Sequence, residues 1–176
     1  MRFSKGFRHT RSSSDGLRIT PGTRNDIGEI DELYVSVGWS SPGGIRARDN
    51  FLLARHRRVL AGTLMYWLED PDIYYLQDDP PAPYADNGRM SVSEVLVASD
   101  SRRSGVGRRL MHAAAAAAMA EGISWMRVEP SPRGSEAERT GRIRFFEACG
   151  FRTWRWEPHL EMVGAPAVVL SATNLT

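Results

Sequence analysis

The stretch that decides the fold reads Arg102-Arg103-Ser104-Gly105-Val106-Gly107. It lies between a short apolar run, Val92–Ala98, and an alanine-rich segment, Arg108–Ala120. The first run predicts a strand and the second a helix, so a glycine turn opens a helix directly after a strand. The first N–H groups of a helix have no partner within it, and the helix dipole gives them positive character. Such a turn is typical of a phosphate-binding site, because Gly105 and Gly107 let an anion approach the main chain closely.

Two common phosphate-binding motifs do not fit this turn. A P-loop requires Gly-Lys followed by Ser or Thr, which this sequence lacks. A dinucleotide-binding turn requires G-x-G-x-x-G, and here Leu110 stands in place of the third glycine. The pattern that does fit is R-x-x-G-x-G, preceded by L-V-A-S-D-S at the end of the predicted strand.

This pattern resembles the acyl-CoA-binding motif of the GNAT family of N-acetyltransferases. A second stretch, Arg144–Phe151 (R-F-F-E-A-C-G-F), looks like the late helix of that family, which ends in a Gly-Phe turn. The two motifs occur in the order and at the approximate spacing that the family shows. The resemblance covers residues 16–172.

The apolar patterns and the resemblance predict one fold class. Apolar residues have helical spacing over Thr23–Gly38, and a further helix is predicted over residues 139–149. Besides the Val92 strand, strands are predicted at residues 16–20, 50–56, 59–68, 123–128, 151–156 and 161–171. We therefore expect one α/β (α+β) domain over residues 16–176, after a basic, disordered tail at residues 1–15. Its mixed sheet would have six to seven strands and helices on both faces, and would splay between the Val92 and Ile123 strands.

Length and composition narrow the class of protein. A chain of 176 residues is long enough for one domain with a sizeable core. No apolar run approaches the roughly 20 residues that span a bilayer, and the basic start lacks the apolar stretch of a secretory signal. The single cysteine, Cys149, excludes an internal disulfide and suits a reducing cytoplasm. No histidine lies near it in the sequence, so we expect a helix residue rather than a nucleophile. No Cys and His cluster has metal-ligand spacing, so we expect no metal.

The net charge of +2 hides an asymmetry along the chain. The first 24 residues carry a charge of +5 and the remainder carries −3. The basic excess therefore belongs to the N-terminal tail, which is too short and too poor in aromatic residues to predict a nucleic-acid-binding module.

The resemblance implies an acyl-CoA site where the two central strands part. Main-chain groups of Val95, Leu96 and Val97 would pair with the pantetheine arm. An N–H group near Leu96 or Val97 would hold the thioester carbonyl and stabilise the oxyanion formed on it. Arg139 replaces an asparagine that the family carries on its late helix, and would form a salt bridge to a CoA phosphate. The pyrophosphate would lie on the turn formed by Arg102, Arg103, Ser104, Gly105, Val106, Gly107 and Arg108.

The proton-transfer residues depart from the family. Many members carry a carboxylate at the position of Ser91 or Ser93, and both are serines here. The candidate general base is Glu94, which is one residue out of phase with Ser91 and Ser93. In a regular strand its side chain would therefore face the other side of the sheet, unless a β-bulge rotates it. The alternative is a structural carboxylate paired with an arginine. Phe146 stands where the family has the tyrosine that acts as general acid, so the resemblance implies that Phe146 borders the cofactor. Because a phenyl ring has no proton to donate, water would protonate the CoA thiolate.

An acidic, aromatic segment precedes the Val92 strand. It holds Glu69, Asp70, Asp72, Asp78, Asp79 and Asp86 without a basic residue, together with Tyr74, Tyr75 and Tyr84. Such a segment attracts cations, so Asp78, Asp79 and Tyr84 are candidate acceptor-binding residues. The alternative is a solvated surface loop. By resemblance, Trp39 would also border the acceptor; otherwise it is a core aromatic residue.

The sequence thus favours an enzyme that moves an acetyl group from acetyl-CoA to a primary amine by direct attack in a ternary complex. The acceptor would be a cationic small molecule or a peptide, and among nucleic acids only aminoacyl-tRNA would be an acceptor. A non-catalytic acyl-CoA-binding or sensory module is the alternative, supported by Ser91, Ser93 and Phe146. A nucleotide-binding domain is a third class. Homodimerisation stays open.

Overall fold

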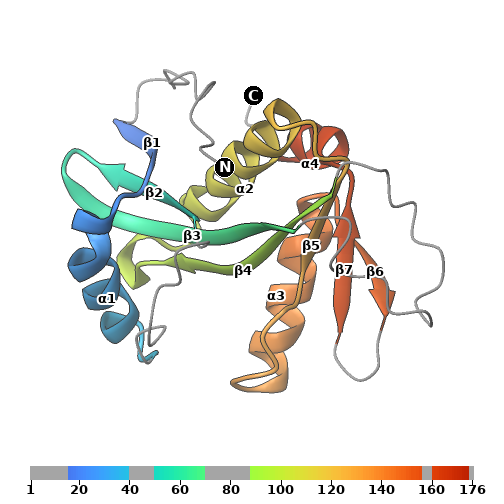
Figure 1. Ribbon diagram of the computed structural model, residues 1–176. Coiled ribbons are helices and arrows are strands. Elements are labelled where there is room, and N and C mark those ends of the chain that lie inside the picture. The colour runs from blue at the N-terminus through green and yellow to red at the C-terminus, as the bar shows by residue number, and fades with distance from the viewer. Residues whose placement is uncertain (1–15, 40–49, 70–87, 156–159, 175–176) are drawn as a thin grey trace.

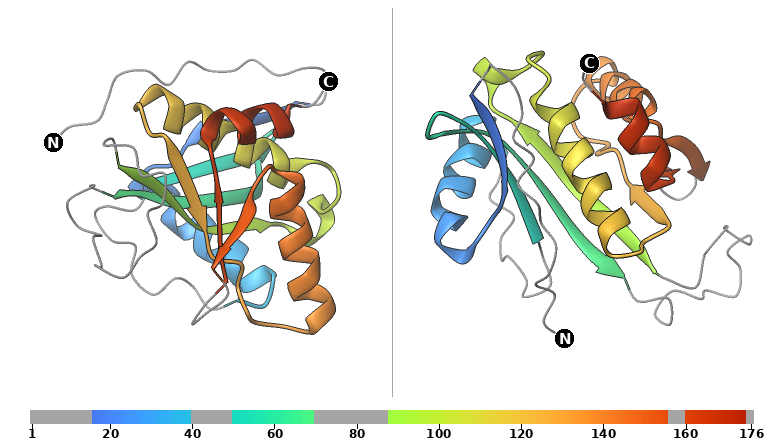
Figure 2. Two further views of the ribbon diagram at one scale, coloured as in Figure 1. Left: turned by 90° about the vertical axis from the view of Figure 1, so that its right-hand side faces the viewer. Right: turned by 90° about the horizontal axis from the view of Figure 1, so that it is seen from above.

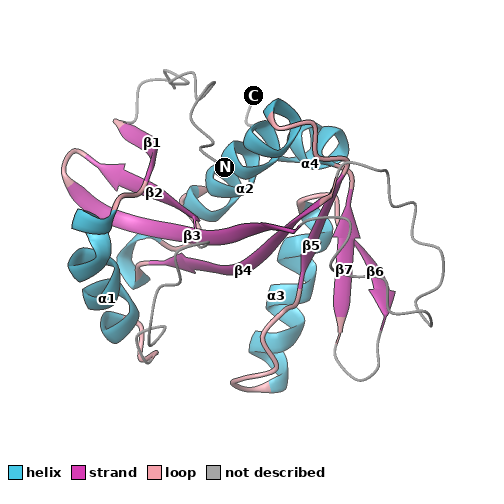
Figure 3. Cartoon of the chain, viewed as in Figure 1, coloured by secondary structure: helices cyan, strands magenta, loops and turns pink. Residues whose placement is uncertain are grey.

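The computed structural model describes residues 16–39, 50–69, 88–155 and 160–174. These residues form a seven-stranded sheet in the order β1-β2-β3-β4-β5-β7-β6, with helices packed against it (Figure 1). Neighbouring strands are antiparallel except β4 and β5, which are parallel (Figure 3). The mixed sheet and the single α/β class agree with the prediction.

The strands and helices follow one another in nearly the predicted order. The strands are β1 Leu17–Pro21, β2 Asn50–His56, β3 Val59–Glu69, β4 Arg89–Val97, β5 Trp125–Val128, β6 Arg152–Arg155 and β7 Glu161–Gly164. The helices are α1 Ile27–Ser36, α2 Val106–Ala120, α3 Glu136–Ala148 and α4 Pro166–Thr173, with short 3-10 turns at η1 Arg24–Asp26 and η3 Ser99–Ser101. None of these helices is long and apolar enough to cross a membrane.

The prediction of a strand through residues 161–171 is wrong in its second half. The strand β7 ends at Gly164, and α4 follows from Pro166 to Thr173. Pro166 has no N–H group and cannot donate a hydrogen bond to a neighbouring strand. It is favoured in the first turn of a helix, because N–H groups there have no partner within the helix. Val169 is fully buried in the cluster under α2, so tertiary packing overrides the strand propensity of Val168 and Val169.

Helices cover both faces of the sheet, as predicted. One face packs in a large core cluster with α2, and this cluster also takes Phe146 from α3 and Val169 from α4. The other face packs in a smaller cluster, in which α1 contributes Ile30, Leu33 and Tyr34. Figure 2 shows α1 and α2 on opposite sides of β2, β3 and β4. We call these two sides the α2 face and the α1 face.

The alanine run of α2 brings this helix close to the sheet. Ala114, Ala115 and Ala118 are fully buried. At the start of the helix, Gly62 of β3 has so little space that a Cβ there would lie 2.9 Å from Cγ1 of Val106. Small side chains on both elements therefore fix the first turn of α2 against the middle of the sheet.

Candidate active site

A bulge in β4 changes the face to which its side chains point. Val92 pairs with Tyr66 and Glu94 pairs with Met65, so Ser93 is an extra residue between them. Val92 belongs to the core cluster under α2, whereas Leu96, four residues later, belongs to the cluster under α1. With strict alternation these two residues would share a face. The extra residue therefore turns Glu94 to the α1 face, as the sequence analysis required.

The bulge also marks the point at which β4 and β5 part. Their parallel pairing runs from Arg89 with Trp125 to Val92 with Val128. From Ser93 to Val97, β4 keeps β3 on one side, and no described strand pairs with its other edge. Main-chain N–H and C=O groups on such an edge can bond an extended ligand. This edge includes Val95, Leu96 and Val97, whose role in acyl-CoA binding stays a prediction.

Glu94 is half-buried and accepts a hydrogen bond from a tyrosine of α1. The hydroxyl of Tyr34 donates to Oε2 of Glu94, and no described residue bonds the other oxygen, Oε1. Burial raises the pKa of Glu94 above its usual value, although the Tyr34 hydrogen bond and the charge of Arg133 oppose this effect. A carboxylate with a raised pKa and an available oxygen has the properties of a general base.

A second carboxylate on the same face has a different environment. The side chain of Glu69 is 3% exposed and forms a salt bridge with Arg89. Its Oε1 also accepts hydrogen bonds from the Trp67 indole at 2.7 Å and from the Ser91 hydroxyl at 2.8 Å. Where the family carries a carboxylate on β4, this chain thus has Ser91 bonded to a carboxylate from β3. Because Glu69 is buried and fully paired, it fits a structural role better than a catalytic one.

The glycine turn has the backbone conformation of an exposed helix start. Gly105 is the N-cap of α2 with φ of 83°, in the left-handed region that favours glycine. No described side chain caps the helix, so the N–H groups of Val106, Gly107 and Arg108 have neither an intrahelical nor a side-chain partner. This is the arrangement that binds a phosphate, as the sequence predicts for these residues.

The arginines around the turn point in different directions. Arg102 and Arg103 are exposed, and the charge of Arg102 reaches Glu138 in the first turn of α3. Arg139 is exposed in that same turn, so the start of α3 lies near the glycine turn. The guanidinium of Arg108 instead donates to the carbonyl of Ala172 in α4. Arg108 can therefore serve a phosphate through its main-chain N–H, whereas the exposed side chains of Arg102 and Arg103 are available to it from the turn itself. The predicted role of Arg139 at a CoA phosphate stays a prediction.

Gly107 has a packing role in addition to the predicted one. A Cβ at this position would lie 3.2 Å from Cζ of Phe145 and 3.6 Å from Cγ2 of Val97. Phe145 in turn stacks edge-to-face on Phe146, which is buried in the core cluster and also contacts Phe151. Gly107 thus lets α3 approach α2, which the sequence analysis missed.

The remaining predicted site residues have separate outcomes. Trp39 is half-buried and packs against the cluster that contains Tyr34, and its main-chain N–H donates to the main-chain carbonyl of Tyr34 at 2.9 Å. Asp78, Asp79 and Tyr84 lie outside the described residues, so their acceptor role stays a prediction. Cys149 is buried at the end of α3, and burial raises the pKa of its thiol to about 11, so it is not an ionised nucleophile at neutral pH.

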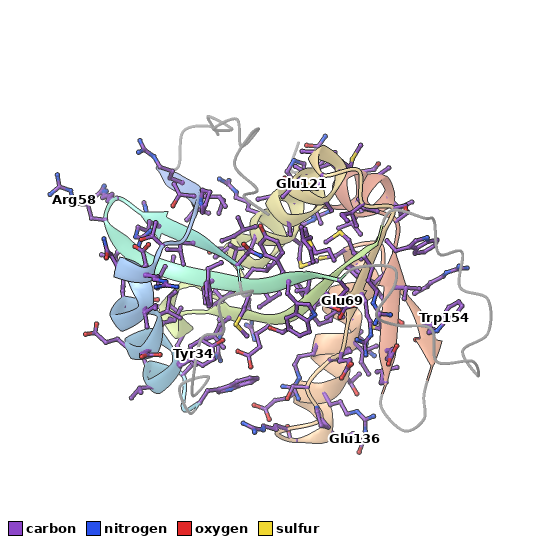
Figure 4. All side chains as sticks on the ribbon, viewed as in Figure 1. Tyr34, Arg58, Glu69, Glu121, Glu136 and Trp154 are labelled. Atoms are coloured by element: carbon purple, nitrogen blue, oxygen red, sulfur yellow. The ribbon has the colours of Figure 1, made fainter. Side chains whose placement is uncertain are left out.

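Two residues of the site escaped the sequence analysis. Tyr34 lies in the stretch Thr23–Gly38, for which only a helix was predicted, and Glu69 was predicted only as part of an acidic segment. A tyrosine on the buried stripe of a helix usually requires a partner for its hydroxyl, and this is the signal that pointed to a polar group beneath α1. In Figure 4, Tyr34 lies below the sheet, on the side of α1, whereas Glu121 lies above it on α2.

Comparisons with known proteins agree with this geometry. The profile of the Acetyltransferase (GNAT) family matches residues 23–151. This range contains Tyr34, the bulged strand, the glycine turn and α3. No curated protein sequence is significantly similar to the chain.

Solved structures share the fold at low sequence identity. The ribosomal-protein-S18-alanine N-acetyltransferase of Escherichia coli superposes with a TM-score of 0.61 at 15% identity, over 85% of this chain and 93% of that chain. A chain of the NatC complex bound to Gag peptide and CoA has a TM-score of 0.58 at 13% identity, over 85% of this chain and 98% of that chain. An aminoglycoside acetyltransferase from an uncultured soil metagenomic sample has a TM-score of 0.55 at 14% identity, over 76% and 86% of the two chains.

Proposed function

The chain belongs to the GNAT acetyltransferase family, and we propose that it moves an acetyl group from acetyl-CoA to a primary amine. The observation that carries this proposal is the bulge at Ser93. At one point of β4 the bulge turns a half-buried carboxylate to the α1 face, and beyond it the strand edge is free. Ser93 lies nine residues before Arg102, the first residue of the glycine turn. Three features thus follow one another along β4 and the turn after it: a candidate base, a strand edge that can bond an extended ligand, and a candidate anion-binding site.

The residues around these features fit acetyl-CoA, which would supply the thioester that the amine attacks. The N–H groups of Val106, Gly107 and Arg108 and the exposed side chains of Arg102 and Arg103 suit a pyrophosphate. The free edge of β4 from Ser93 to Val97 suits an amide-bearing arm, because such an arm can pair with a strand.

Glu94 is the residue to which we assign the proton of the acceptor amine. In a ternary complex the amine nitrogen forms a bond to the carbonyl carbon, the carbon–sulfur bond breaks, and Oε1 of Glu94 takes the proton that the nitrogen loses. Phe146 offers no proton for the departing thiolate, so we assign that proton to water. The buried, neutral thiol of Cys149 supports direct attack over a covalent enzyme intermediate, and a single buried cysteine also suits the cytoplasm.

The acceptor is proposed to be cationic. Glu94 and the acidic segment ahead of β4 are both negative, and a cationic amine gains from each. The structural relatives include enzymes named for a ribosomal protein and for aminoglycosides, so the fold accepts both macromolecular and small amines. A non-catalytic acyl-CoA-binding module is the second candidate, favoured by Phe146 in place of a proton-donating tyrosine. Acetyl-CoA binding without CoA release on a broad panel of amines would favour this second candidate.

Gly105 provides the direct test of cofactor binding. At a concentration about 100-fold above its Kd, acetyl-CoA should stabilise the wild-type protein by about 2.7 kcal/mol, which corresponds to a rise in Tm of about 5–10 °C. Gly105→Glu should abolish this rise because it places a carboxylate against the pyrophosphate. The matched control is Gly122→Glu at the other end of α2, since Gly122 has a φ of 72° and open space around it. If Gly105→Glu retains the full rise in Tm, the cofactor site lies elsewhere. Gly107 is unsuitable for this test because a side chain there displaces Phe145.

The acidic segment predicts a salt-sensitive preference for cationic acceptors. Changing Asp78, Asp79 and Asp86 together to asparagine should raise KM for a polyamine-like or lysine-like amine and leave kcat nearly unchanged, because clustered exposed charge acts on encounter. The wild-type KM should also rise with salt, since the Debye length of about 8 Å at physiological ionic strength becomes shorter. The measurement is kcat/KM for cationic and neutral amines at low and high salt. The control is the triple glutamine variant of three exposed acids elsewhere, Glu32, Glu121 and Glu136. Equal preference in the two triple variants would show that the segment does not select the acceptor.

A further inference from the structure

Tyr34 and Glu94 form a contact between elements that lie 60 residues apart in the sequence. The phenol donates to one oxygen of the carboxylate, and the ring is buried in the cluster under α1. Tyr34 belongs neither to the glycine turn nor to the free edge of β4. Packing explains the aromatic ring of Tyr34 but not its hydroxyl, because a phenylalanine would fill the same apolar cluster equally well. The hydroxyl therefore points to a role in its contact with Glu94.

Two ion pairs and the buried residues of α1 hold this helix, and with it Tyr34, in a defined position. Arg55 of β2 donates to Asp26 at 2.8 Å and to Glu29 at 2.5 Å, which ties the start of α1 to the sheet. Ile30 and Leu33 then bury the next turn in the α1-face cluster. Tyr34 consequently reaches Glu94 from a helix that is held at its first turn and along its buried face, so the hydroxyl has a defined position.

The charges around the pair keep the tyrosine as a donor. Burial raises the pKa of Tyr34, and the hydrogen bond and charge of Glu94 and the charge of Asp31 raise it further, so the phenol stays protonated at physiological pH. From the loop before α3, Arg133 acts on Glu94 with a positive charge. The β3 residue opposite Glu94 is Met65, which carries no charge. The groups that bias Glu94 toward its ionised form are thus the Tyr34 hydroxyl and Arg133.

We propose that Tyr34 is a positioning residue for Glu94: its hydroxyl holds Oε2, so that Oε1 is directed to the acceptor amine. This inference rests on the proposed function and assigns a role to a residue of α1. Two carboxylate oxygens and one fixed donor leave a single oxygen for the proton transfer. The donor also stabilises the ionised carboxylate, which is the form a base requires.

The test is Tyr34→Phe, which removes the hydroxyl and keeps the ring. The matched control is Tyr66→Phe, because Tyr66 is a half-buried tyrosine of β3 that packs against the α2-face cluster, on the opposite side of the sheet from Tyr34. One readout is the titration of the Glu94 carboxyl by ¹³C NMR of glutamate-labelled protein, assigned with Glu94→Gln. The other is the pH profile of kcat/KM with the best amine from an acceptor panel.

Loss of the hydroxyl should move the titration midpoint of Glu94 up by about one pH unit, because the ionised form loses its donor. The acid limb of kcat/KM should move to higher pH by the same amount, and kcat at pH 7 should fall about 10-fold. Tyr66→Phe should change neither, and 3-fluorotyrosine at position 34, which retains the O–H as a stronger donor, should move neither the midpoint nor the acid limb to higher pH. A wild-type midpoint in Tyr34→Phe, or a moved midpoint with an unmoved kinetic limb, would overturn the proposal. Full activity of Glu94→Gln would instead refute the assigned base, so the two failures are distinguishable.

Discussion

Glu94→Gln is expected to lower kcat by about 10²–10³-fold and to leave the affinity for acetyl-CoA unchanged. Glutamine keeps the size of the side chain and can still accept a hydrogen bond from Tyr34, but it cannot take a proton from the amine. The variant therefore removes proton transfer and little else. Turnover by CoA release and affinity by thermal shift are the two measurements. Unchanged turnover would show that the base is another group or water.

The wild-type pH profile follows from the direction of the Glu94 pKa shift. Burial raises this pKa above the usual value of 4.5, and a base must be ionised to act. The kcat/KM value should thus fall as the pH is lowered through the raised pKa, at a higher pH than for an unperturbed glutamate. The acid limb should be absent from the residual activity of Glu94→Gln.

Stability provides an independent check on the role of Glu94. A carboxyl whose pKa is raised on folding favours the folded state in its protonated form, and this contribution is lost as the pH rises through the folded pKa. At pH 7 the ionised, half-buried Glu94 therefore costs stability, and Glu94→Gln should have an equal or higher Tm. A clear fall in Tm would instead favour a structural carboxylate. Glu121→Gln, the same change at the exposed end of α2, should alter neither turnover nor Tm.

Loss of Glu69 is expected to have the largest effect on stability. Glu69→Ala removes a buried carboxylate that pairs with Arg89, whose own side chain is only 13% exposed, and so takes one negative charge away from a half-desolvated guanidinium. Breaking a buried pair in this way costs about 3–5 kcal/mol, which lowers Tm by about 6–20 °C in a domain of this size. The hydrogen bonds from Trp67 and Ser91 are lost with it.

The control for this prediction is a second ion pair on the same sheet. Glu129 pairs with Arg127, but its side chain is 47% exposed. Glu129→Gln should therefore change Tm by no more than about 4 °C, because exposed pairs contribute about 0–1 kcal/mol. The double variant Glu69→Leu with Arg89→Leu should lose less stability than Glu69→Ala, since it removes both charges of the buried pair together. A Tm of Glu69→Ala within a few degrees of the wild type would contradict the buried-pair interpretation.

The sequence by itself determined the parts of this protein that are encoded locally. The glycine turn and the first turn of α2 follow from neighbouring residues, since Gly105 needs a left-handed φ and the helix start needs no distant partner. The order of strands and helices up to β7 follows from apolar periodicity in the same way. These features were predicted because a few adjacent residues fix the backbone conformation.

The tertiary structure decided the chemistry of the site. Whether Glu94 faces α1 depends on one extra residue in the register of β4 against β3, and no local pattern encodes register. The partners Tyr34 of Glu94 and Arg89 of Glu69 lie 60 and 20 residues away in the chain, so only the sheet and the packing of α1 bring them together. Packing on α2 likewise made a helix of Pro166–Thr173, whose β-branched residues favour a strand. Periodicity states which face of an element is buried, but the position of one element against another is set by the shape of the whole core.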